Sequence, residues 1–322
     1  MNTFIEAFSG EAVVWDWIIA VYLFLAGMSA GMVMIAIYLK RKVIEGRAAD
    51  NGIIKATAIL APFGIVVGLT ILVFHLTKPL AFWKIMIYVN TTSIMSMGVI
   101  LFNVYMAVLF VWLAVLFKDE LLNILNKFVG DKLNFIGLII DKIKPLENML
   151  EVILAVLAVT LAAYTGFLLS ALKTFPLLNN PVLPVLFVFS SLSSGAAASL
   201  MFGVLVFKQS MHCPSVKWVH GFERPVVMFE LFLLLCFFSG LILGGGQKEA
   251  AAMAAIGAGF WAGWFWIGVV GLGMLLPLIL NFVTSEQTRH TSSFLFMVTG
   301  LSLLGVLMLR TFILYAGQMT VV

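Results

Sequence analysis

Long apolar runs alternate with short polar segments along the whole chain. Each run is mostly hydrophobic over roughly 20 residues or more, the length that a helix needs to cross roughly 30 Å of hydrocarbon. About eight such runs are present, near residues 14–39, 53–76, 93–117, 149–172, 182–207, 223–244, 255–281 and 292–316. The pattern predicts an all-α membrane protein with about eight transmembrane helices and no separate soluble domain.

The composition agrees with this interpretation. Of 322 residues, 62% are hydrophobic and 11% are charged, and the mean hydropathy is +1.12. A soluble domain has an apolar fraction nearer to half, so a multi-pass membrane protein is expected. No basic segment and no small-residue cleavage site precede the first run, so we expect the first helix to be retained.

Basic residues gather in every second loop, which predicts the orientation. The rich loops and their edges hold Lys40, Arg41, Lys42, Arg47, Lys55, Lys118, Lys127, Lys132, Lys142, Lys144, Lys208, Lys217, Arg224 and Arg289. The opposite side has only Lys78, Lys84, Lys173 and Lys248. Because cytoplasmic loops carry the excess of Lys and Arg, we expect both termini on the outer, periplasmic side. The net charge of +4 follows from this bias and does not indicate nucleic-acid binding.

The eight helices divide into two halves. Residues 1–147 supply three spans and an inner interfacial helix over 119–147, residues 148–177 supply the fourth span, and residues 178–322 supply the second four-helix half. The segment 119–147 alternates apolar and charged residues at near-helical spacing, which is typical of a helix on a membrane surface. The first helix of each half carries a small-residue cluster, AGMSAG and SSGAAAS. The clusters indicate close helix packing, with or without a true duplication.

Metal-binding residues are scarce. Two separated cysteines, Cys213 and Cys236, cannot hold an iron–sulfur cluster. A haem with two axial histidines is not expected either, since only one of the four histidines lies in or near the end of a span. The four are His75, His212, His220 and His290. No HExxH motif and no P-loop is present, so a partner must bring any redox metal.

Three polar side chains lie near the predicted outer face. Tyr22 on the first helix and Tyr164 on the fourth both lie roughly 12 Å below that face, and His75 ends the second helix beside it. Phenol and imidazole groups can hydrogen-bond the two carbonyls of a quinone and exchange its protons. Interfacial tyrosines and a headgroup-wetted histidine would give the same pattern. Arg310, roughly 9 Å below the face, either snorkels outward or fixes a quinone oxygen.

A second polar set points to a proton path from the cytoplasm. Glu230 lies roughly 10 Å above the predicted inner face, with Glu223 at the face two turns below it. Serines follow near mid-membrane on the fifth helix, among them Ser190 and Ser194, with Asn103 on the third helix at similar depth. Carboxylates are costly in hydrocarbon and commonly mark a path. The alternatives are that Glu223 is an ordinary charge at the membrane interface and that Glu230 only pairs with a neighbouring helix.

The first run, WDWIIAVYLFLAGMSAGMVM, resembles the opening signature of the NrfD/PsrC family. This family comprises the integral membrane subunits of polysulfide reductase and related molybdoenzyme complexes. The resemblance extends to the chain length, the eight helices, the two halves and the lack of haem. It implies a bacterial inner-membrane subunit that oxidises menaquinol near the periplasmic face. Electrons would then pass to a four-cluster iron–sulfur subunit and on to a molybdopterin catalytic subunit.

The resemblance also assigns residues. The polar residues of the family map onto Tyr22, Tyr164, Glu230 and Arg310, and the quinone-binding tyrosine falls on the fourth helix, at Tyr164. His75 departs from the pattern, because an aspartate can be found there. The terminal substrate stays open, since polysulfide, thiosulfate, tetrathionate, nitrite and arsenate would all be reduced by the partner.

Two other classes of protein remain in view. A secondary transporter with an intramembrane Glu and Arg site would show helices broken by Gly or Pro at mid-membrane. The prolines here, Pro62 and Pro225 among them, are expected at helix ends, with Pro277 as the exception. A purely structural anchor would need none of the buried polar groups.

Overall fold

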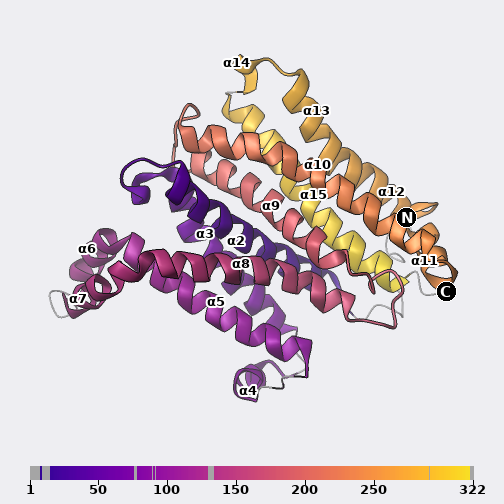
Figure 1. Cartoon of the computed structure of the whole chain (residues 1–322), viewed down its shortest axis with the longest axis horizontal. Coiled ribbons are helices and arrows are strands. Elements are labelled where there is room, and N and C mark those ends of the chain that lie inside the picture. Colours follow the sequence, from indigo (N-terminus) through magenta and orange to yellow (C-terminus); the bar gives the residue numbers. More distant parts are fainter. Residues whose placement is uncertain are drawn as a thin grey trace.

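The computed structural model describes Phe8 and residues 15–75, 78–88, 90, 92–129, 134–289 and 291–319. Throughout these residues the regular structure is helical, without strands, and eight segments are long and apolar enough to cross a membrane. They are α2 (Trp17–Lys42), α3 (Gly52–Phe74), α5 (Ile94–Leu116), α8 (Glu147–Ser170), α9 (Leu183–Leu205), α10 (Pro214–Leu243), the series α12, η5 and α13 (Phe260–Val283), and α15 (Ser292–Met319). The predicted all-helical, eight-span fold is confirmed, and the long helices run side by side (Figure 1).

Short helices cap the two ends of this bundle. The basic end, named for the loops 43–51, 117–146, 206–213 and 284–291, carries α6 (Lys118–Val129), α7 (Asn134–Ile143) and α14 (Glu286–Arg289). The opposite end carries α4 (Phe82–Ile87) and α11 (Gly246–Ile256). We call it the terminal end, because Trp15 and Gln318 meet there through two hydrogen bonds of 2.8 and 2.9 Å.

Helices α2 and α9 form the centre of the bundle. Small residues let their backbones touch: a Cβ on Gly31 would lie 1.8 Å from the Ser191 carbonyl oxygen, and one on Gly195 would lie 2.3 Å from the Gly31 carbonyl carbon. The two small-residue clusters therefore pack against each other where α2 meets α9. Both helices also contact α3, α8 and α15. Whether the halves are repeats stays a prediction.

Helix α10 runs further than the sequence pattern indicated, and two prolines lie inside helices. Helix α10 begins at Pro214 instead of near residue 223, with its proline in the first turn, where a missing N–H is harmless. Pro225 and Pro62, expected at helix ends, lie inside α10 and α3, so that expectation was wrong. Both helices continue past the proline, because neighbouring groups in a bundle tolerate the lost hydrogen bond.

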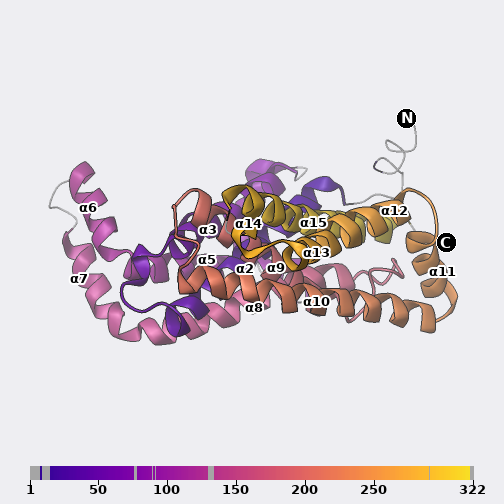
Figure 2. The ribbon, with the colours of Figure 1, turned by 90° about the horizontal axis from the view of Figure 1, so that it is seen from above.

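The segment predicted as one interfacial helix over 119–147 is divided into α6, α7 and a short 3-10 turn. Helices α6 and α7 lie side by side beyond the basic end (Figures 1 and 2), where Lys118 pairs with Asp141 at 2.5 Å. Arg47 contacts both Asp119 and Glu120 at 2.9 to 3.0 Å. The pair of helices is thereby tied to the loop that precedes α3. Residues 130–133 lie outside the described residues.

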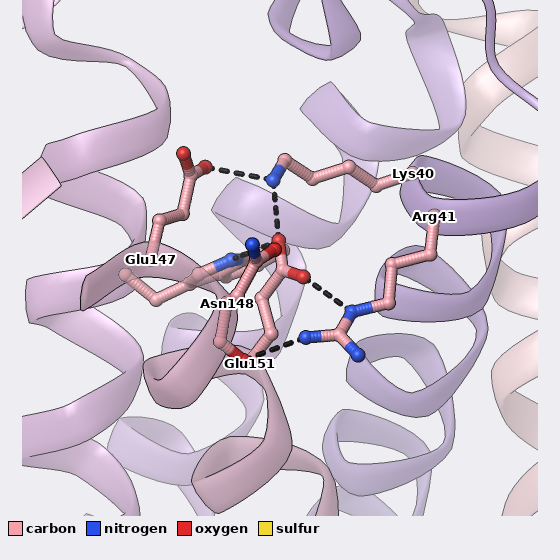
Figure 3. Close-up of polar contacts among 6 residues, drawn as sticks. Lys40, Arg41, Glu147, Asn148 and Glu151 are labelled. Carbon is pink, nitrogen blue, oxygen red and sulfur yellow. Dashed lines mark hydrogen bonds and ion pairs between the residues drawn. The ribbon is translucent and has the colours of Figure 1, made fainter. Parts of the chain in front are cut away.

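A buried ion network also holds the basic end together (Figure 3). Glu151 on α8 is fully buried and accepts hydrogen bonds from the Lys40 amine, from Arg41 Nε at 2.5 Å and from Trp112 Nε1 at 3.5 Å. Lys40 also pairs with Glu147 at 2.7 Å. The network joins α2, α5 and α8 and leaves the Glu151 carboxylate fully engaged.

Candidate functional site

A cavity of about 560 Å³ lies between α2, α3, α5 and α8 near the terminal end. Its size fits a small organic ligand. The walls are mostly aliphatic and aromatic, with Tyr22, Thr70, Asn103 and Tyr164 as the polar side chains, and helix α4 adds Phe82 and Met86. Such a site suits a flat apolar molecule that presents a few polar atoms.

The two tyrosines predicted from common depth do line one cavity. Tyr22 and Tyr164 are 5% and 8% exposed. Phe102 packs against both, with its ring centroid 5.6 Å from that of Tyr22 and 6.1 Å from that of Tyr164. Among the described residues neither phenol has a hydrogen-bond partner, although buried tyrosine hydroxyls normally find one. Both phenols are therefore available to a ligand.

Gly98 on α5 makes room for the Tyr164 ring. A Cβ at this position would lie 1.9 Å from the Tyr164 hydroxyl oxygen, so any larger residue would displace the phenol. The sequence analysis did not single out Gly98. The sequence gives only a weak indication of this role, namely that Gly98 is the only glycine in α5.

His75 stands beside the cavity without lining it. It caps the C-terminus of α3, directly after the cavity residue Phe74. Its Nδ1 lies 3.8 Å from Asp16 Oδ2, and Asp16 also accepts a hydrogen bond from the Ile18 N–H at 3.1 Å as the N-cap of α2. The sequence analysis missed Asp16, although an aspartate directly before a helix is a common N-cap.

Arg310 neither snorkels to the surface nor lines the cavity. It is fully buried, and its guanidinium donates to Thr165 Oγ1 at 3.4 Å, to the Phe187 carbonyl at 3.1 Å and to Ser191 Oγ at 3.1 Å. The guanidinium carbon also lies 3.6 Å from the centroid of the Phe187 ring, a cation–π contact. Thr165, which Arg310 contacts, directly follows the cavity residue Tyr164 in α8. Arg310 therefore lies behind the cavity wall.

Glu230 carries the negative charge that interacts electrostatically with Arg310. It is 1% exposed, has Ser193 as a hydrogen-bond partner and interacts electrostatically with Arg310 without a direct ion pair. Its Oε1 and the Arg310 Nε have no hydrogen-bond partner among the described residues. Gly27 allows this arrangement, because a Cβ there would lie 2.6 Å from Ser191 Oγ and 3.0 Å from Arg310 Nη2.

Glu223 is buried, contrary to the alternative of an interfacial charge. It is 3% exposed and accepts a hydrogen bond from Ser302 on α15 at 3.0 Å, while its Oε2 has no partner among the described residues. Ser194 is less available than expected, since its hydroxyl donates to the Ser190 and Ser191 carbonyls of its own helix. The Ser190 hydroxyl is buried without a described partner.

The structure thus separates the predicted site residues into three groups. Tyr22 and Tyr164 share the cavity, and His75 lies at its rim beside Asp16. The buried polar residues form a line across α10, α9, α15 and α8 that ends at the back of the cavity wall. From the basic end, they are Glu223 with Ser302, Glu230 with Ser193, and Arg310 with Thr165.

Metal ligands do not gather in the described part of the chain. No group of three or more His, Cys, Asp or Glu residues there could hold a metal ion, and Cys213 and Cys236 are free thiols. The expectation that the chain carries no haem and no iron–sulfur cluster stays a prediction.

The comparison with known proteins matches this architecture. The family model described as polysulphide reductase, NrfD, matches residues 6–322. The chain belongs to the NrfD family. It is 48% identical to protein NrfD of Escherichia coli over 98% of each sequence. It is also 45% identical to the NrfD homolog of Haemophilus influenzae and 41% identical to the C chain of polysulfide reductase from Wolinella succinogenes, each over 96% of this sequence and 95% of the relative. The resemblance predicted from the first helix is confirmed.

Proposed function

We propose that this NrfD-family protein is the membrane subunit of a quinol-linked oxidoreductase complex in the bacterial inner membrane. Menaquinol is oxidised in the cavity of Tyr22 and Tyr164, and the electrons leave to an iron–sulfur partner subunit that passes them to a molybdopterin catalytic subunit. The observation that carries this proposal is the cavity itself: apolar walls of about 560 Å³ with two phenols that have no described partner.

The chemistry requires hydrogen bonds to the two quinol oxygens and an exit for protons and electrons. Oxidation of a quinol releases two electrons and two protons. Tyr22 and Tyr164 can donate to, or accept from, the two oxygens and hold the ring over Phe102. The electrons pass to the iron–sulfur partner subunit. The protein itself therefore supplies binding, orientation and proton transfer.

Two proton routes are available from the cavity. The short route is His75 with Asp16 at the terminal end, where an imidazole 3.8 Å from a carboxylate can take and release protons. The long route is the buried polar line from Arg310 and Thr165 to Glu230 and Glu223, with Ser190 and Ser194 beside it. Water must bridge the steps of this line, and its unpaired buried atoms are suitable hydrogen-bond partners for water.

The orientation is part of the proposal. The excess of Lys and Arg at the basic end favours a cytoplasmic position for that end, with the cavity and the termini toward the periplasm. One relative is named as the C chain of a polysulfide reductase, and that name implies further subunits. We expect such partners to cover the terminal end, because electrons leave from the side of the cavity.

Replacement of Tyr164 by Phe tests the proposed quinol site. The change removes the hydroxyl and keeps the ring over Gly98, so we expect turnover with menaquinol to fall about tenfold, equivalent to about 1.4 kcal/mol. Activity of the catalytic partner with an artificial electron-donating dye should stay unchanged. Tyr38→Phe is the matched control, since Tyr38 lies at the basic end, stacked on Trp218. Unchanged quinol kinetics in Tyr164→Phe would remove this tyrosine from the site.

A further inference from the structure

Asn103 is an unusual side chain for its position. It lies in the middle of the membrane-spanning helix α5, it is exposed on the outer surface of the bundle, and it lines the cavity. Its Nδ2 donates to the Val99 carbonyl of the same helix at 2.8 Å. No described residue hydrogen-bonds its Oδ1 or uses its second N–H. An amide facing hydrocarbon with an unused acceptor is unfavourable unless something else binds it.

The cavity opens sideways at the same place. Its wall includes exposed side chains of two neighbouring helices, Val66 and Thr70 on α3 and Met95 and Asn103 on α5. In a bilayer this side faces lipid. The Thr70 hydroxyl donates to the Val66 carbonyl at 2.6 Å, with its proton committed to its own helix. Asn103 is therefore the polar side chain at this opening with an uncommitted amide N–H and carbonyl oxygen.

We propose that the gap between α3 and α5 is the lateral entrance for quinol, and that Asn103 is the hydrogen-bonding residue of this entrance. Its Oδ1 accepts a hydrogen bond from a quinol hydroxyl as the ring passes from the bilayer into the cavity. The spare N–H donates to a carbonyl when the oxidised quinone leaves. The inference rests on the proposed function, because it presupposes that the cavity oxidises quinol.

The depth of Asn103 fits a binding role rather than a part in the oxidation. It follows Gly98, the contact residue of Tyr164, by five residues, so it lies about 7 Å further from the terminal end along α5. A ring that enters beside Asn103 meets this amide before it reaches the tyrosines. Loss of the amide should therefore weaken capture of quinol and leave the reaction at the tyrosines intact.

The experiment measures menaquinol oxidation by the whole complex in proteoliposomes, over a range of quinol concentrations. For Asn103→Leu we expect KM to rise about 3- to 10-fold, because one hydrogen bond to quinol is lost. The kcat should stay within about twofold of that of the unchanged protein. Asn103→Gln keeps an amide and should restore most of the affinity. Thr160→Val is the matched control, because Thr160 is another lipid-exposed polar residue whose hydroxyl bonds its own helix, and it does not line the cavity.

The outcomes separate this inference from the proposed function. A normal KM in Asn103→Leu, combined with slow turnover in Tyr164→Phe, would overturn the role of Asn103 and leave the quinol site in place. A lower kcat at unchanged KM would overturn the capture role as well. Normal kinetics in both variants would overturn the cavity as the quinol site. If Asn103→Leu fails to assemble, labelling of the unaltered complex by a photoreactive menaquinone analogue decides. Label on the exposed lining residues Val66, Thr70 or Asn103 supports the entrance, and label confined to the buried lining around Tyr22 and Tyr164 refutes it.

Discussion

At the scale of single residues, two buried glutamates differ in how completely they are bonded. Glu151 has three donors around its carboxylate, which is typical of a structural charge. Glu230 has Ser193 and the field of Arg310, and one oxygen without a described partner. A carboxylate that lacks a direct ion pair in a membrane interior can take up and release a proton. This difference favours the proton path over a purely structural role for Glu230.

Glu230→Gln tests that role, since glutamine keeps the shape and most of the hydrogen bonding but cannot titrate. In proteoliposomes we expect quinol turnover, or the pH change linked to it, to fall at least several-fold while the complex still assembles. Glu249→Gln on the exposed helix α11 serves as the control. Normal rates together with normal proton movement would leave Glu230 as a packing residue.

At the scale of helices, the sequence predicted well which segments form membrane-spanning helices, because the length of an apolar run is a strong signal. It predicted neither the true start of α10 nor the division of 119–147 into α6 and α7. Polar residues such as Lys217 and His220 occupy the first turns of α10, so the apolar run begins later than the helix does. Length and hydropathy report the span in the bilayer, whereas helix ends depend on local capping and tertiary contacts.

The candidate site was predictable only in part, for a related reason. Tyr22 and Tyr164 could be paired by depth, because helix rise converts residue number into height. The direction in which a side chain points around its helix axis could not be read in the same way. This direction places Asn103 on the lipid side of the cavity and Arg310 in the interior. Gly98 matters solely through the ring that packs against it. Contacts of this kind need the helices in place.

Glu151 is a helix-scale feature that the sequence analysis overlooked, since it lies at the start of a predicted span where an interfacial charge is ordinary. Glu151→Ala would remove the acceptor of Arg41 Nε and Trp112 Nε1 between α2, α5 and α8, and Arg41 would keep only its hydrogen bond to the Asn148 carbonyl. Breaking a buried ion network by removing one partner costs about 3–5 kcal/mol. We expect a clear loss of thermal stability of the purified protein, measured by unfolding in detergent. Glu120→Ala on the exposed helix α6 should have a much smaller effect, and equal losses in both would contradict the assignment.

At the scale of the whole molecule, the two ends are built for different neighbours. The basic end is rich in Lys and Arg and carries its own helices α6 and α7, which pack against α5. The terminal end holds the cavity, and α4 contributes Phe82 and Met86 to it while leaving other apolar side chains uncovered. Leu80 is 92% exposed and Tyr88 76%. An apolar patch of this kind beside a ligand site indicates a contact surface.

We predict that the electron-accepting partner covers the surface formed by α4 and its flanks, from Lys78 to Tyr88. The side chain of Ile85 lies outside the described residues. Exposed aromatic residues at the centre of an interface commonly contribute more than about 1 kcal/mol each. Trp83→Ala together with Tyr88→Ser should therefore weaken partner retention about tenfold or more in co-purification. Phe282→Ala, an exposed aromatic near the basic end, is the matched control.

Lysine cross-linking of the assembled complex gives an independent measurement of the same surface. Lys78 and Lys84 belong to the α4 surface, whereas Lys118, Lys127 and Lys142 mark α6 and α7. Because electrons must leave the cavity by a short path, we expect the iron–sulfur partner to be linked through the first pair. Links confined to α6 and α7 would contradict both the docking surface and the proposed orientation, since the partner would then lie at the far end of the bundle from the two tyrosines.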